Sequence, residues 1–119
     1  MALVGTTKQL DDAIQEGCAA GKLVVVNFFS PDCYGCKSLQ PKLRQLARER
    51  EASALFLKVD GSADGLREYC EAQGVTKIPF FHFYRDGARV AELTANMQPE
   101  KLRLLRDTLE AHGAGAALR

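Results

Sequence analysis

Residues 23–37 read LVVVNFFSPDCYGCK: an apolar run, then a Ser-Pro step, then two cysteines separated by two residues. The run over 23–29 is apolar on both faces, a pattern typical of a central parallel strand covered by helices on each side. A helical pattern then extends from about residue 33 to residue 50. Its core face consists of Leu39, Leu43, Leu46 and Ala47. The stretch therefore predicts a buried strand that leads directly into a helix with both cysteines at its start.

The rest of the chain supplies further helices and strands. Apolar residues at helical spacing predict a first helix over 7–19. We also expect a strand over 54–60, a short helix around 66–70, strands over 80–84 and 88–93, and a final helix from Pro99. Asp86-Gly87 favours the positive φ angles of a tight hairpin turn between the last two strands. With a short strand near 3–5, the order predicts an α/β fold, a mixed central sheet of four or five strands with helices on both faces.

Length and composition are those of one globular domain. The chain has 119 residues, of which 46% are apolar and 26% charged, enough for one compact core. We expect the domain to span residues 1–112 and a flexible tail to follow over 113–119, where glycines break the helical pattern. The net charge of +1 gives no pull toward nucleic acid or an anionic membrane. The sequence has neither a membrane-length apolar run nor the pattern of a secretory signal peptide.

The cysteine pair has the position that thiol chemistry needs. Cys33 falls at the N-terminus of the predicted helix, where unpaired backbone N–H groups and the helix dipole stabilise a thiolate. Only the thiolate attacks a disulfide, so Cys33 is the candidate nucleophile. Cys36 lies one turn further in and should be buried, where it would resolve a mixed disulfide by attacking Cys33. Lys37 either adds positive charge beside the pair or is an ordinary solvated helix residue.

Half of a zinc site is the alternative interpretation of two cysteines at this spacing. Zinc needs two further ligands, and the chain has no second Cys-x-x-Cys and no His-x-x-x-His. The other candidate ligands are scattered along the sequence: Cys18, Cys70, His82 and His112. We therefore expect no metal, and no cofactor beyond the redox-active Cys33–Cys36 disulfide itself. A working dithiol in a reducing compartment is the better interpretation than two structural disulfides.

The strand that leads into Cys33 and Cys36, the helix residue Pro41, and Ile78-Pro79 before a strand together resemble the thioredoxin family. The resemblance covers nearly the whole chain and implies the thioredoxin fold. It implies a thiol–disulfide oxidoreductase that exchanges two electrons with protein disulfides or dithiols and is recycled by an upstream reductase or dithiol donor. It also implies a cis bond before Pro79, beside the dithiol, and backbone hydrogen bonds from Ile78 to the substrate chain.

Several further segments are shared with one subfamily. They are Phe28-Phe29-Ser30-Pro31, Cys-x-Gly-Cys-Lys at 33–37, Pro79-Phe80-Phe81 and Phe83-Tyr84-Arg85, with an extra cysteine at Cys70. In these segments the chain is similar to the atypical cysteine/histidine-rich thioredoxins of plant and algal plastids. That likeness implies a location in the plastid stroma, and the cytoplasm is the alternative. It also implies a bias toward oxidising targets, with a 2-Cys peroxiredoxin as a partner. We expect a monomer.

The motif departs from ordinary thioredoxin around the first cysteine. Asp32 replaces the usual tryptophan before that cysteine, and Tyr34-Gly35 replaces the usual Gly-Pro. We expect Asp32, Tyr34 and Gly35 to line a substrate groove together with Ile78 and Pro79.

A second departure concerns the proton of Cys36. Asn27 stands where the family has a buried aspartate that helps to deprotonate the second cysteine. Phe56 stands where the lysine partner of that aspartate is usual. A neutral amide cannot act as a general base near neutral pH, so the proton would pass to water or to the leaving thiolate.

Alternatives remain for two cysteines and for the function. Cys18 and Cys70 both lie on apolar helix faces, where a buried structural cysteine is the default interpretation. Cys70 is alternatively a regulatory thiol. The alternative function is a thioredoxin-fold binding module that docks partners around Pro79 without turnover. Retention of both Cys33 and Cys36 favours the oxidoreductase.

Overall fold

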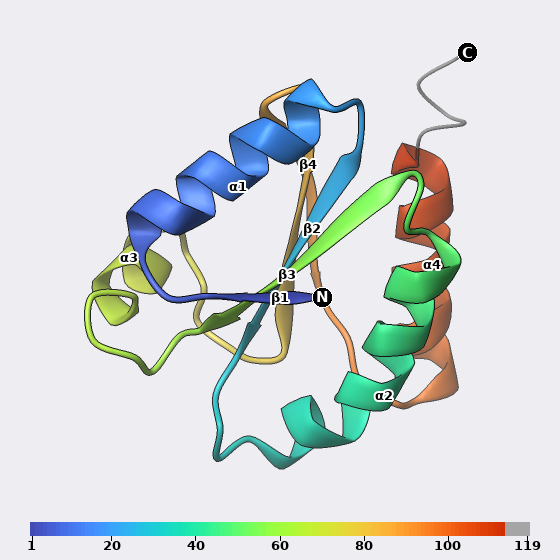
Figure 1. Cartoon of the computed structure of the whole chain (residues 1–119). Helices are drawn as coiled ribbons and strands as arrows, with labels where there is room; N and C mark the ends of the chain where they lie inside the picture. The colour runs from blue at the N-terminus through green and yellow to red at the C-terminus, as the bar shows by residue number, and fades with distance from the viewer. Residues whose placement is uncertain (114–119) are drawn as a thin grey trace.

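A five-stranded mixed sheet forms the centre of the computed structural model, which describes residues 1–113 (Figure 1). The strands are β1 (Ala2–Val4), β2 (Leu23–Phe29), β3 (Ala54–Asp60), β4 (Phe80–Arg85) and β5 (Ala88–Thr94). The helices are α1 (Thr7–Ala19), α2 (Tyr34–Glu49), α3 (Arg67–Ala72) and α4 (Pro99–His112). Figure 1 shows α1 and α3 on one face of the sheet and α2 and α4 on the other. The predicted fold class is confirmed. Beyond Gly113, the predicted tail lies outside the described residues.

Strand β2 occupies the middle of the sheet, whose order is β1-β3-β2-β4-β5. β1 and β2 run parallel to β3, whereas β4 runs antiparallel to both β2 and β5. Helices cover both faces of β2, which explains why its sequence is apolar without alternation. Because β4 is antiparallel to β2, its start lies beside the end of β2, and Phe28 pairs with Phe80. The loop after β2 and the segment before β4 therefore meet at one end of the sheet.

Each face of the sheet has its own apolar core. Leucines of α2 and α4, among them Leu39 and Leu105, pack with Val25, Phe56 and Phe81 on one face. The other face buries residues of α1, α3 and the sheet, which include Leu10, Ile14, Leu66, Phe28 and Phe80. Alternate residues of β2 thus face different helices, and Asn27 shares the α2 side with Val25.

Local sequence signals set the ends of several elements. The Thr6 hydroxyl accepts a hydrogen bond from the Gln9 N–H at 3.1 Å and caps α1. Asp86 and Gly87 have φ angles of 54° and 85°, as the hairpin between β4 and β5 requires. Pro99 begins α4, where a missing N–H costs nothing. The predicted elements therefore form where the sequence places them, to within one or two residues.

Helix α1 packs differently from the prediction at one position. Gly17, not Cys18, is its third buried residue, and Cys18 is only half-buried. A Cβ at Gly17 would lie 2.6 Å from Val24 Cγ2 and 3.0 Å from Leu55 Cδ2. Only glycine lets the helix approach the sheet this closely. Cys18 therefore packs against the core as a structural cysteine would, but it is only partly buried, and the expectation of full burial is wrong.

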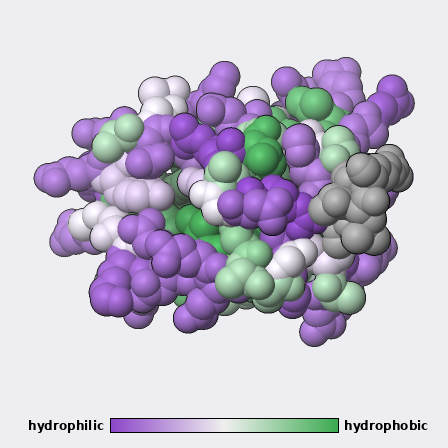
Figure 2. All heavy atoms as spheres, turned by 90° about the horizontal axis from the view of Figure 1, so that it is seen from above, coloured by the Kyte–Doolittle hydropathy of each residue, from purple (hydrophilic) through white to green (hydrophobic). Residues whose placement is uncertain are grey.

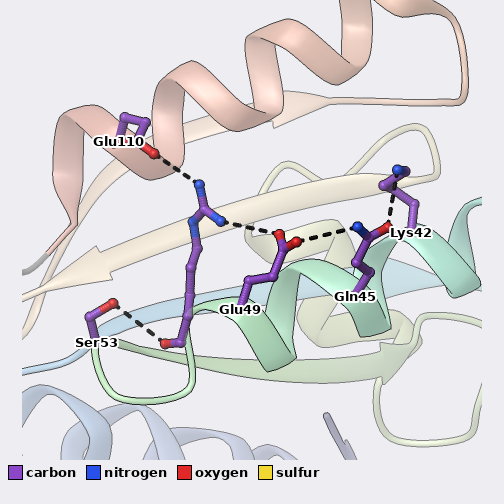
Figure 3. Close-up of polar contacts among 6 residues, drawn as sticks. Lys42, Gln45, Glu49, Ser53 and Glu110 are labelled. Atoms are coloured by element: carbon purple, nitrogen blue, oxygen red, sulfur yellow. Dashed lines mark hydrogen bonds and ion pairs between the residues drawn. The ribbon is translucent and has the colours of Figure 1, made fainter.

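The C-terminal ends of α2 and α4 are tied by an ion pair. Arg50, just after α2, contacts Glu110 of α4 at 3.0 Å and Glu49 at 3.8 Å. Figure 3 shows Glu49 and Glu110 on their two helices with Ser53 below. The pair lies at the C-terminal end of α2, whereas Cys33 lies at its N-terminal end.

The surface opposite the dithiol is mostly hydrophilic. Figure 2 looks onto the end of the sheet away from the loop after β2, and its apolar patches are small and scattered. Among residues 1–113, no helix has the length and apolar character needed to cross a membrane.

Candidate active site

Cys33 caps the N-terminus of α2. Its thiol accepts a hydrogen bond from the Cys36 N–H at 3.1 Å, and its carbonyl accepts one from Lys37 N–H, also at 3.1 Å. The turn before α2, from Ser30 to Cys33, is closed by a 3.2 Å hydrogen bond from the Cys33 N–H to the Ser30 carbonyl. The predicted helix start thus proves to be an N-cap, with the sulfur aimed at the free N–H groups of the first turn. An anionic sulfur is favoured in this position.

Cys36 differs sharply from Cys33 in exposure. It is buried, with 1% of its surface exposed, whereas Cys33 is partly exposed, and both thiols are free. Burial, and then the hydrogen bond with Cys33, raises the pKa of Cys36 to about 12. A reagent or partner from solvent therefore meets Cys33 first, and Cys36 is held protonated behind it.

Pro79 lies against the cysteine motif. The Ile78–Pro79 bond is cis, as the resemblance implied. A Cβ on Gly35 would lie 3.9 Å from Pro79 Cδ, so the two residues are close neighbours. The Pro79 carbonyl accepts a 2.9 Å bond from the Thr94 hydroxyl. Ile78 is 38% exposed, and no hydrogen bond within residues 1–113 uses its backbone. The backbone of Ile78 is thus available to an extended chain lying across the dithiol.

A groove of about 280 Å³ runs from Ile78 toward α3. We call it the Ile78 groove; its lining includes Phe29, Gly61, Arg67, Cys70, Lys77 and Ile78. Arg67 and Lys77 give it a basic border. Burial, with the nearby Asp60 carboxylate, raises the pKa of the Cys70 thiol, which keeps that thiol protonated.

Asn27 is buried on the α2 side of β2 and contacts Gln40. Its Oδ1 accepts a 3.3 Å hydrogen bond from Gln40 Nε2. Phe56 belongs to the apolar core on the same face, and Lys58, the register partner of Asn27, places its ammonium 4.7 Å from the centre of the Phe29 ring. Gln40 was not among the residues predicted from the sequence to lie near the dithiol. Its spacing of four residues from Cys36, on one helix face, is the signal that could have found it.

The remaining predicted residues of the motif lie on the surface. Tyr34 is 83% exposed, and Asp32 and Lys37 are exposed beside it. The structure thus gathers the motif and Ile78-Pro79 in one place, as expected. His82 lies on the other face of the sheet, buried with Phe28 and Phe80 and away from the dithiol. Within residues 1–113, no three His, Cys, Asp or Glu side chains gather in a way that could hold a metal ion.

Comparisons with known proteins point in one direction. The family profile described as Thioredoxin matches residues 2–107. Thioredoxin-like 1-2, chloroplastic, of Arabidopsis thaliana is 40% identical over 81% of this chain, and the match covers 38% of that relative. The Thioredoxin H-type protein of Chlamydomonas reinhardtii is 34% identical, and the match covers 80% of this chain and 81% of the relative.

Solved structures give the same result. The X-ray structure of Fasciola hepatica thioredoxin has a TM-score of 0.78 at 33% identity and covers 94% of this chain and 99% of its own. The chain spans only 33% to 39% of the length of the first chloroplastic relatives that it matches.

Proposed function

The chain belongs to the thioredoxin family, and we propose that it is a thiol–disulfide oxidoreductase that exchanges two electrons with protein targets through Cys33 and Cys36. The observation that carries the proposal is the contrast between the two sulfurs. Cys33 is reachable and accepts the N–H of the first helical turn, whereas Cys36 is buried directly behind it. Attack by one sulfur and release by the other require this asymmetry.

The reaction proceeds in two exchanges. The Cys33 thiolate attacks one sulfur of a target disulfide, which forms a mixed disulfide and expels the other target sulfur as a thiolate. Cys36 then loses its proton and attacks the Cys33 sulfur, which forms the Cys33–Cys36 disulfide and frees the second target thiolate. The two thiol protons of the chain end on the two target sulfurs. The target is reduced by two electrons and the chain is oxidised by two.

The target chain is proposed to lie along Ile78 and Pro79. The unpaired backbone of Ile78 supports this placement, because an extended segment can form strand-like hydrogen bonds there. Gly35 leaves space against Pro79, and the exposed Tyr34 ring and Asp32 lie at the entrance. Lys37 adds positive charge on the first turn of α2.

Turnover of insulin disulfides with dithiothreitol as the dithiol donor tests the proposal. We expect the wild-type chain to accelerate insulin reduction and both Cys33→Ser and Cys36→Ser to abolish the acceleration. Cys70→Ser should retain it. A wild-type chain that binds disulfide-containing partners but gives no acceleration would instead favour a binding module without turnover.

The likeness to chloroplastic relatives supports a more specific proposal. The chain acts in the plastid stroma. We propose that it acts as a monomer. The resemblance of its motif to the atypical plastid thioredoxins adds the further proposal that it oxidises targets that include a 2-Cys peroxiredoxin. Its dithiol is then a weaker reductant than ordinary thioredoxin, with a midpoint above roughly −270 mV. A redox titration against glutathione measures this midpoint, and a value at or below that figure would contradict the oxidising bias.

Cys70 is proposed as a regulatory thiol. Its place on the lining of the Ile78 groove supports the proposal, because a modified thiol there would obstruct a bound target. Burial and the raised Cys70 pKa make the reaction slow, so regulation would need sustained oxidation. Peroxide treatment should lower insulin reduction by the wild-type chain more than by Cys70→Ser. Equal losses of insulin reduction in the wild-type chain and in Cys70→Ser would show that Cys70 is not a regulatory thiol.

A further inference from the structure

A second hollow lies at the end of α2 away from the dithiol. It has a volume of about 520 Å³, and its walls come from the last turns of α2, the start of β1 and the start of β3 (Figure 1). We call it the Arg44 hollow; its lining includes Lys22, Arg44, Arg48, Glu51, Leu55 and Phe56. Cys33 caps the other end of α2, which places Arg48 about 22 Å further along the helix at 1.5 Å per residue. A molecule bound in the Arg44 hollow therefore leaves both cysteines free.

The Arg44 hollow has an excess of positive charge. Lys22 precedes β2, and Arg44 and Arg48 lie one turn apart on α2, whereas the described lining has one acidic residue, Glu51. Arg44 and Arg48 are exposed, and Lys22 is partly exposed. None of these three cations forms an ion pair with a carboxylate of residues 1–113. The three charges are therefore available to an anionic partner.

The two arginines match the repeat of an extended peptide. Arg44 and Arg48 are four residues apart, so they share one helix face and their backbone positions differ by about 6 Å along the helix axis. Alternate side chains of an extended chain point the same way and lie about 6.6 Å apart. Two carboxylates at alternate positions can thus each reach one guanidinium group, which binds a carboxylate through two parallel N–H donors.

The floor of the Arg44 hollow favours a peptide over a nucleic acid. Ala47 of α2 and Leu55 and Phe56 of β3 contribute apolar surface on which side chains of a peptide can pack. A nucleic-acid strand would instead need a longer row of cations, because its affinity comes from neutralising many phosphates. Glu51 would repel such a strand, and the net charge of the chain is only +1.

We propose that the Arg44 hollow is a docking site for an extended acidic segment of a partner protein. Carboxylates at alternate positions of that segment pair with Arg44 and Arg48, and a further carboxylate pairs with Lys22. A partner held there by one segment stays near Cys33, which raises the local concentration of any disulfide that it carries. This last consequence rests on the proposed oxidoreductase function, whereas docking itself does not.

A fluorescein-labelled peptide in which glutamate alternates with valine tests the proposal by fluorescence polarisation. We expect saturable binding to the wild-type chain at low salt and weaker binding at about 0.15 M salt, because exposed ion pairs are screened. The same peptide with glutamine in place of glutamate should not bind. Arg44→Gln combined with Arg48→Gln should weaken binding about tenfold, since each exposed ion pair contributes up to about fivefold.

Two arginines of α4 provide a matched control. Arg103 and Arg106 are exposed and line a different hollow, of about 480 Å³, which also contains Asp107. Arg103→Gln combined with Arg106→Gln removes the same charge as the first pair of substitutions and should weaken binding less than about twofold. All four side chains are exposed, so urea unfolding should show both double variants folded.

Amide NMR shifts locate the bound peptide. We expect shifts at Ala47 and Leu55 and none at Cys33 or Cys36. Shifts centred on the two cysteines, the absence of saturable binding, or equal losses in the two double variants would overturn the docking site. An oligothymidylate that competes as well as the glutamate peptide would show a site for polyanions in general and would overturn the assignment to a peptide.

Insulin reduction keeps this proposal separate from the oxidoreductase. Arg44→Gln combined with Arg48→Gln should reduce insulin as the wild-type chain does, and so should the wild-type chain saturated with the glutamate peptide. Loss of insulin reduction in either case would show that the Arg44 hollow is not independent of the dithiol and would overturn its separate role. Polarisation needs no turnover, so a wild-type chain that binds the peptide but does not reduce insulin would contradict the oxidoreductase and support the docking site.

Discussion

Lowering the pH from 7 to 5 should weaken the fold through His82. This side chain is fully buried between aromatic rings, with centroids 4.9 Å from Phe28, 5.5 Å from Phe80 and 6.2 Å from Tyr84. The Arg89 guanidinium lies 3.3 Å from its ring nitrogens, and Glu92 is its register partner on β5. Burial, and then the charge of Arg89, lowers the pKa of His82 from 6.5 to about 4.

The loss follows from proton binding by the unfolded chain. Above pH 6.5 both states hold a neutral imidazole, so His82 costs nothing. Below pH 6.5 the imidazole of the unfolded chain binds a proton, whereas the buried imidazole of the native state binds one only near pH 4 and below. Each pH unit in this window is worth about 1.4 kcal/mol, which gives about 2 kcal/mol at pH 5 and about 3 kcal/mol near pH 4.

Urea unfolding at pH 7, 6 and 5 measures the effect. His82→Phe keeps an aromatic ring in the cluster and should flatten the pH dependence over this range. His112→Gln removes the other histidine of the chain, in the last turn of α4, and should keep the full slope. If the wild-type stability changes by less than about 0.5 kcal/mol over this range, or if His82→Phe keeps the wild-type slope, His82 is not the group that weakens the fold.

Three further results are expected. Gly17→Ala should lower the free energy of unfolding in urea by about 2 kcal/mol, because its Cβ would lie 2.6 Å from Val24 Cγ2. Gly5→Ala should lower it much less, because its Cβ would meet only Gln9 Oε1 at 3.5 Å. Equal losses in the two variants would contradict the close packing of α1 at Gly17. Glu110→Gln should lower the free energy of unfolding by less than about 1 kcal/mol, because the glutamate that pairs with Arg50 is exposed. A larger loss would show that the ion pair between α2 and α4 contributes more to stability than an exposed pair usually does. Iodoacetamide at pH 7 should label Cys33 at least about tenfold faster than Cys36, as peptide mass spectrometry would measure, and comparable rates would reverse the assignment of the two thiols.

The sequence carries most of the fold because its signals are local. Asp86-Gly87 specifies a turn by backbone conformation alone, and the unbroken apolar run of β2 specifies a strand covered on both faces. Helix packing distances are not local. The burial of Gly17 in place of Cys18 depends on Val24 and Leu55, which the helical spacing of α1 does not reveal.

The site divides in the same way. The place of Cys33 at the helix start follows from its spacing, and the proximity of Pro79 follows from the family resemblance. The partnership of Asn27 with Gln40 joins a strand to a helix through side chains 13 residues apart. Finding it requires knowing how α2 rotates over β2, which the packing of Leu39 and Leu43 decides.

Trapping the mixed disulfide shows directly whether Cys33 is the attacking thiol and Cys36 the resolving one. Cys36→Ser and Cys33→Ser are each mixed with a disulfide-linked peptide at pH 7, and intact and peptide mass spectrometry locates the adduct. We expect a stable peptide adduct on Cys33 in Cys36→Ser. We expect only slow labelling of Cys33→Ser, because Cys36 is buried with a pKa of about 12. Equal adduct formation in the two variants, or an adduct carried by Cys18 or Cys70 in Cys36→Ser, would contradict this assignment of the two thiols.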